Sequence, residues 1–121
     1  MSRDESAPQS LHVRSNAGVA VVGFASPYLQ SEQVIEKVGA ELLDLVDEQG
    51  FTKVILSFNG VRFASSSMLA QVVKLHKKLM KQKGMLRLCS LTPSLREVLK
   101  VSQLDRLLDV HEDEASALNK F

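Results

Sequence analysis

Three consecutive serines, Ser65, Ser66 and Ser67, are the residues of this sequence whose type and position best fit a chemical or regulatory role. They follow a glycine turn and precede apolar residues at helical spacing, so we expect them at the start of a helix. One of them can cap that helix by accepting a backbone N–H, and we assign this role to Ser65 or Ser66. The other hydroxyls can accept a phosphate, which the free N–H groups and the dipole of a helix start would stabilise.

Hydrolytic, redox or metal chemistry is not indicated. The chain lacks the Gly-x-Ser-x-Gly turn that presents a catalytic serine, and His76 lies about three helical turns beyond the serines. His12 and His111 stand in other predicted elements, and none of the three histidines has a zinc-ligand pattern around it. The one cysteine, Cys89, lies in an apolar-rich segment, where a buried, unreactive thiol is expected. We therefore predict neither an enzyme nor a bound metal or cofactor.

The apolar pattern predicts the elements that position the serines. Residues 53–58 are nearly continuously apolar and β-branched, which is typical of a strand buried on both faces. The helix that follows the serines should end near Gly84, since glycine favours the C-terminal cap. Ligand sites in parallel sheets lie at the carboxyl ends of the strands, so the serines occupy a favourable position for binding.

The rest of the chain continues the alternation of strands and helices. The other expected elements are a hairpin of strands 11–14 and 19–22, a helix over 33–49, a strand over 86–89, a helix capped by Thr92, a strand over 107–110 and a helix opening at 112–114. This order predicts an α/β fold, with a mostly parallel central sheet that has an initial hairpin and is flanked by helices.

The length of 121 residues and the hydrophobic fraction of 45% predict one domain with one core. We divide the chain into a disordered polar leader, residues 1–10, and a globular domain, residues 11–121. The longest apolar stretch, 18–25, is far shorter than the roughly 20 residues that span a bilayer, and the polar start does not resemble a secretory signal. We therefore expect a cytoplasmic protein without membrane insertion.

Charge is distributed unevenly along the chain. Residues 1–50 hold three Lys and Arg against eight Asp and Glu, whereas residues 51–121 hold twelve against six. The net charge of +1, with one tyrosine and no tryptophan, argues against a nucleic-acid-binding domain. Four lysines share one face of the helix after the serines: Lys74, Lys77, Lys78 and Lys81. They form either a solvated surface or a docking surface for an acidic partner, and the acidic first helix could meet a basic one.

Two stretches of the sequence resemble the STAS domain, the fold of bacterial anti-sigma factor antagonists and stressosome subunits. The first runs from Val54-Ile55-Leu56-Ser57-Phe58-Asn59-Gly60-Val61 to Leu69, where the family typically reads Asp-Leu-Ser-Gly-Val, then Phe, then Asp-Ser-Ser-Gly-Leu. The second runs from Leu91 to Leu108 and contains Leu104-Asp105-Arg106-Leu107, like the family's ending. The chain departs from the motif at Ser57 and Ser65, where the family has aspartate, and at Met68, where it has glycine.

The resemblance implies a protein that binds a kinase-type anti-sigma factor and is switched off when that kinase phosphorylates a serine. The match places Ser66 at the phosphorylated position, with Ser65 and Ser67 as alternatives. We assign partner binding to Ser65, Ser67 and Met68 at the motif and to Lys74 and Lys78 on the lysine face of the same helix. Met68 would serve as an exposed apolar contact or would pack into the core, and the two are equally compatible with the sequence.

The altered motif leaves two other functions open. The chain could be a constitutive scaffold or interaction subunit of a signalling or transport assembly, with no phosphorylation. Alternatively, a groove beside the serines could bind an anion or an apolar ligand.

Overall fold

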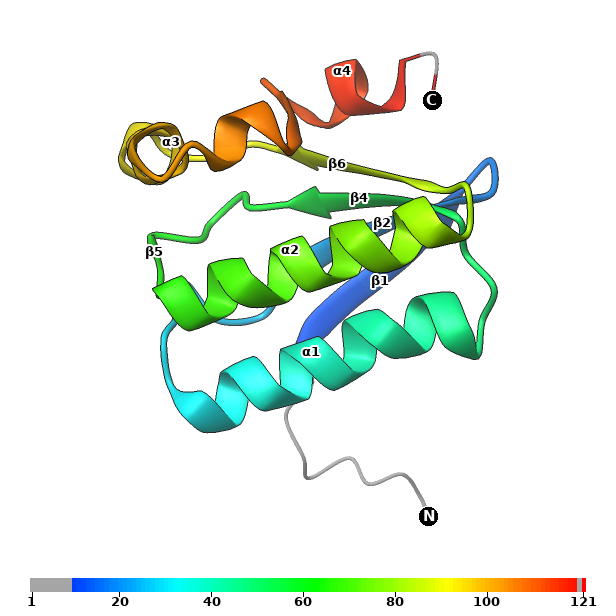
Figure 1. Cartoon of the computed structure of the whole chain (residues 1–121), viewed down its shortest axis with the longest axis horizontal. Coiled ribbons are helices and arrows are strands. Elements are labelled where there is room, and N and C mark those ends of the chain that lie inside the picture. The colour runs from blue at the N-terminus through cyan, green and yellow to red at the C-terminus, as the bar shows by residue number, and fades with distance from the viewer. Residues whose placement is uncertain (1–9, 120) are drawn as a thin grey trace.

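The computed structural model describes residues 10–119 and 121, which form a sheet flanked by helices (Figure 1). The predicted disordered leader lies outside the described residues apart from Ser10, and stays a prediction. The elements in chain order are β1 (Leu11–Asn16), β2 (Val19–Phe24), β3 (Tyr28–Leu29), α1 (Glu32–Asp47), β4 (Lys53–Ser57), β5 (Phe63–Ala64), α2 (Ser66–Lys81), β6 (Met85–Cys89), α3 (Pro93–Val101), the 3₁₀ helix η1 (Leu104–Arg106), β7 (Asp109–His111) and α4 (Glu114–Leu118).

The main sheet has the strand order β1-β2-β4-β6-β7. β1 and β2 are antiparallel and form the predicted hairpin, whose turn is Ala17-Gly18 with positive φ at both residues. All the other pairs of this sheet are parallel, because a helix connects each strand to the next. The predicted mostly parallel sheet with an initial hairpin is confirmed.

The core lies mainly between the sheet and the helices α1 and α2, which run side by side across one face (Figure 1). Ala20 and Val22 of β2 point into this core, whereas Val19 and Val21 face the opposite side. α4 covers part of that opposite side, where Ala117 packs in a smaller apolar cluster. Both faces of the central strands are therefore buried, as the continuous apolar run predicted.

Several boundaries differ from the sequence-based expectation. The first helix, α1, is Glu32–Asp47 and not 33–49. It begins earlier because the Ser31 side chain caps it by accepting the Val34 N–H. The last strand is Asp109–His111 and not 107–110, because η1 and the following turn take up the preceding residues. α4 begins at Glu114 because Asp113 is its N-cap. The cap of α3 at Thr92 is confirmed: its side chain accepts the Leu95 N–H.

A second, two-stranded sheet was not predicted. It pairs β3 with β5 in parallel, with Tyr28 opposite Phe63 and Leu29 opposite Ala64. Two residues per strand are too few for any period to be visible in the sequence.

Candidate functional site

The serines are held in place by the loop between β4 and α2. After β4 the chain turns at Asn59-Gly60, where Gly60 has a φ of +86° that favours glycine. The Val61 N–H closes this turn by donating to the Phe58 carbonyl at 2.9 Å. Both Phe58 and Val61 are buried, so the loop is fixed to the core on either side of the turn.

The same loop is then paired to the segment after β2. The Arg62 N–H donates to the Pro27 carbonyl at 2.7 Å, and the Ser65 N–H donates to the Leu29 carbonyl at 2.9 Å. Together with the β3–β5 pairing, these bonds fix the point at which α2 begins. The serines therefore lie on a rigid start of a helix.

The three serines have different environments. Ser65 is the N-cap of α2, because its Oγ accepts the Met68 N–H at 3.2 Å, which confirms one of the two capping assignments. Ser66 and Ser67 lie in the first turn and are exposed, and their hydroxyls make no hydrogen bond with any described residue. The first turn of α2 contains no acidic side chain. Two hydroxyls are thus accessible to solvent at the positive end of the helix dipole.

Met68 is not part of the exposed surface. Its side chain is fully buried and packs in the main core with Leu69 and Val72. Because a residue two positions after the exposed Ser66 has turned by about 200°, it faces inward. Of the two roles left open by the sequence, the core role is the one that the structure supports, and direct contact between Met68 and a partner was a wrong expectation.

Two exposed aromatic side chains lie beside the serines. Tyr28 and Phe63 are register partners in the parallel β3–β5 pair and expose 49% and 46% of their surface. Phe63 is two residues from the Ser65 cap, so the aromatic pair and the accessible hydroxyls belong to one surface. We call this surface, made of Tyr28, Phe63, Ser66 and Ser67, the serine surface. The aromatic pair was not predicted from the sequence, although Phe63 stands within the motif.

The predicted binding lysines lie further along α2. Lys74 is exposed, whereas Lys78 is half-buried and pairs with Asp47 of α1, with 2.8 Å between Nζ and Oδ1. Ser66 and Lys78 are twelve residues apart, which is about 18 Å along a helix. Lys74 is thus about two turns and Lys78 about three turns from Ser66, and they form a different part of the molecule.

The groups considered for other chemistry are not brought to the serines. His76 is half-buried in α2, about 15 Å along the helix axis from Ser66, too far for a hydrogen bond. Cys89 is buried, and this burial raises the pKa of its thiol. Among residues 10–119 and 121, no three His, Cys, Asp or Glu side chains are grouped as metal ligands would be.

A groove of about 410 Å³ lies between the loop that follows β4 and the start of α3. It is lined by Gly60, Val61 and Arg62 from the loop, and by Thr92 and Ser94 at the start of α3.

No helix within the described residues has the length and apolar character needed to cross a bilayer.

The sequence and the structure both match known proteins. Residues 14–117 match the model of the STAS domain family. An anti-sigma-factor antagonist (STAS) domain protein from Planctomyces limnophilus has 26% identity and a TM-score of 0.77, covering 93% of this chain and 97% of its own. An anti-sigma factor antagonist from Mycobacterium paratuberculosis has 20% identity and a TM-score of 0.78, covering 93% and 94%. The phosphorylated form of SpoIIAA from Bacillus has 19% identity and a TM-score of 0.68, covering 87% and 94%.

Proposed function

This chain belongs to the STAS domain family, and from that membership we propose that it is an anti-sigma factor antagonist-like regulatory protein of the cytoplasm. It binds a kinase-type anti-sigma factor through the serine surface, and phosphorylation of Ser66 by that kinase ends the binding. The chain carries out no chemistry of its own and only accepts the phosphate.

The observation that carries the proposal is that Ser66 is accessible while Ser65 caps the helix. A phosphate on Ser66 would lie at the start of a 16-residue helix, where the dipole favours negative charge. The cap would be retained, so the phosphorylated chain would stay folded. The SpoIIAA structure is that of a relative in a phosphorylated form, which supports a phosphate in this fold.

The serine surface also explains how a phosphate would act on binding. An exposed aromatic pair such as Tyr28 and Phe63 is the kind of side chain that contributes most to protein interfaces. A phosphate beside it adds nearly two negative charges, which a partner would have to bury with the aromatic rings. Phosphorylation is therefore expected to weaken the complex through desolvation and repulsion.

Phosphorylation of Ser66 can be tested by intact mass. Incubation of the protein with the cognate kinase and ATP is expected to add one phosphate to the wild type and none to Ser66→Ala. Ser67→Ala and Ser65→Ala are matched controls that should still gain the phosphate. If a kinase with proven activity leaves the wild type unmodified, the switch does not exist; if only the Ser67→Ala variant fails, the acceptor is Ser67.

A constitutive scaffold is the second candidate. It is favoured by Ser65, which caps α2 where the family motif has an aspartate, so the acidic neighbour of the acceptor is missing. The substitution Ser66→Asp separates the two candidates by adding a negative charge without a kinase. The switch predicts at least a tenfold weaker complex, about 1.4 kcal/mol, and the scaffold predicts unchanged binding. Ser94→Asp adds the same charge to the first turn of α3 and controls for charge alone.

A further inference from the structure

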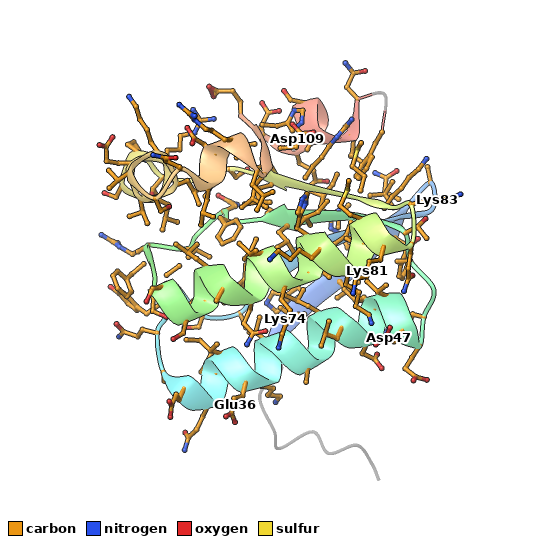
Figure 2. The ribbon with its side chains drawn as sticks, viewed as in Figure 1. Glu36, Asp47, Lys74, Lys81, Lys83 and Asp109 are labelled. Carbon is orange, nitrogen blue, oxygen red and sulfur yellow. The ribbon has the colours of Figure 1, made fainter. Side chains whose placement is uncertain are left out.

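α1 and α2 carry opposite charges on the face that they share. α1 holds five exposed carboxylates and one exposed lysine: Glu32, Glu36, Asp44, Asp47, the C-cap Glu48, and Lys37. α2 holds Lys74, Lys77, Lys78 and Lys81 and no acidic residue. Figure 2 shows Glu36 and Asp47 along α1 and Lys74 and Lys81 along the neighbouring α2. An acidic stripe and a basic stripe thus run next to each other.

These charges are mostly not used inside the chain. Lys78–Asp47 is the one ion pair between the two helices in the described part of the chain. Lys74, Lys77 and Lys81 make no ion pair with any described residue, and neither does Glu48. Most of the charge on this face is therefore available to an outside partner.

The end of α1 carries more negative charge than the Lys78–Asp47 ion pair offsets. Its last turn and C-cap carry Asp44, Asp47 and Glu48 and no basic residue. Negative charge at this end opposes the helix dipole, whose C-terminal end is itself negative. Lysines from outside, placed against this end, would relieve that repulsion.

The surface between the stripes has small side chains. Gly39 of α1 is buried against Gln71, whose Oε1 would lie 2.5 Å from an added Cβ, so the two helices approach closely at this point. The adjoining exposed residues of the two helices include Ala40 and Ala70. The short side chains at these exposed positions allow another helix pair to lie close to this face.

We propose that the α1–α2 face binds a second copy of this chain in a two-fold dimer. α1 and α2 each connect two strands that are parallel to each other, and each helix runs antiparallel to those strands. The two helices therefore run in the same direction (Figure 1). A two-fold axis parallel to the helices, lying in the interface between α1 and α2, places each α1 against the α2 of the other copy. The same rotation keeps the direction of the helices, so the acidic last turn of α1 meets the lysine-rich last turn of α2. One face is thereby complementary to itself, as a two-fold interface requires.

The size of the face predicts a weak dimer. Helices of 16 residues are about 24 Å long, and two neighbours cover a width of about 20 Å. The total buried area is then on the order of 1,000 Å², at the lower end for specific complexes. Because the attraction is between exposed charges, the dimer should dissociate as salt screens them. This dimer does not depend on the function proposed for the serine surface.

The wild-type protein tests the proposal by sedimentation equilibrium. At about 0.5 mM protein and about 20 mM NaCl, the mass should rise from the 13.4 kDa of one chain toward twice that value. At about 500 mM NaCl it should return to that of one chain. A mass of one chain at low salt would overturn the proposal.

Charge reversal tests the geometry. Lys77→Glu with Lys81→Glu places carboxylates near the end of α2, opposite those of α1, and is the acidic double variant. Asp44→Lys with Glu48→Lys places lysines at the end of α1, opposite those of α2, and is the basic double variant. Lys78 and Asp47 are left intact to preserve folding. Each double variant alone should dimerise at least tenfold more weakly than the wild type, because like charges face each other. An equimolar mixture should form a dimer again, since each helix then meets the opposite charge.

A matched control separates this face from net charge. Arg96→Glu with Lys100→Glu changes exposed residues of α3 and alters the net charge as much as the α2 reversal does. Alone it should dimerise as the wild type does. With the basic double variant it should associate more weakly than the acidic double variant does, because only one of the two helix contacts is then attractive. The proposal fails if this mixture associates as strongly as the mixture of the acidic and the basic double variants does. It also fails if the acidic and the basic double variants do not associate with each other.

Discussion

Replacing both Tyr28 and Phe63 with alanine should weaken binding to the kinase-type anti-sigma factor at least tenfold and leave the fold intact. Tyr28 and Phe63 are register partners in the parallel β3–β5 pair, close in sequence to the start of α2, and about half of each residue is exposed. Buried aromatic anchors at interfaces each cost about 2 kcal/mol or more on truncation, so a tenfold loss, about 1.4 kcal/mol, is a lower bound. Titration calorimetry with the anti-sigma factor measures the change.

Exposed apolar area elsewhere supplies the control for this prediction. Met85 exposes 44% of its surface at the start of β6, at the opposite end of the parallel strands from the serines. Met85→Ala should leave the affinity unchanged. Equal losses in Met85→Ala and in the aromatic double variant would show a general effect of apolar area; no loss in either would remove the aromatic pair from the contact surface.

The position of the serine run could be predicted because its causes are local. A buried strand, a glycine turn and a helical apolar period follow each other within about twenty residues, and each leaves a mark in the sequence. Capping is local too, so it could be narrowed to Ser65 or Ser66. What decided between them was the backbone at Ser65, which is extended and leaves its Oγ facing the Met68 N–H.

The aromatic pair could not be predicted because its cause is not local. Tyr28 and Phe63 are 35 positions apart, and they meet only because the loops after β2 and β4 both return over the same end of the sheet. Pairs of two-residue strands have no period that could be read from the sequence. Whether Met68 is buried or exposed could not be predicted for a related reason. At the start of a helix the apolar face is only one residue wide, and its direction depends on how the helix packs against the sheet.

The adjacency of the acidic and basic helices follows from topology. Successive parallel strands connected by helices turn with one hand, so α1 and α2 must cover the same face as neighbours. In the sequence the two charged helices are separate segments, and each was expected to meet a partner of its own. The Lys78–Asp47 ion pair shows that the two helices are neighbours on one face. Because that face carries both charges, one partner, a second copy of the chain, can match both helices.

Phe58→Ala should be among the most destabilising single substitutions in the chain, lowering the free energy of unfolding by about 3–5 kcal/mol. Phe58 is 1% exposed, and its ring lies 5.0 Å from that of Phe24 at a tilt of 39°, so truncation removes both buried area and an aromatic contact. Urea denaturation measures the loss, and Phe63→Ala is the matched control, expected within about 0.5 kcal/mol of the wild type. Phe58 also holds the turn that leads to the serines, whereas Phe63 only presents a surface. Phe58→Ala should therefore lower stability, whereas Phe63→Ala should affect binding and not stability. A loss below about 1 kcal/mol in the free energy of unfolding of Phe58→Ala would mean that the loop is not anchored through this ring.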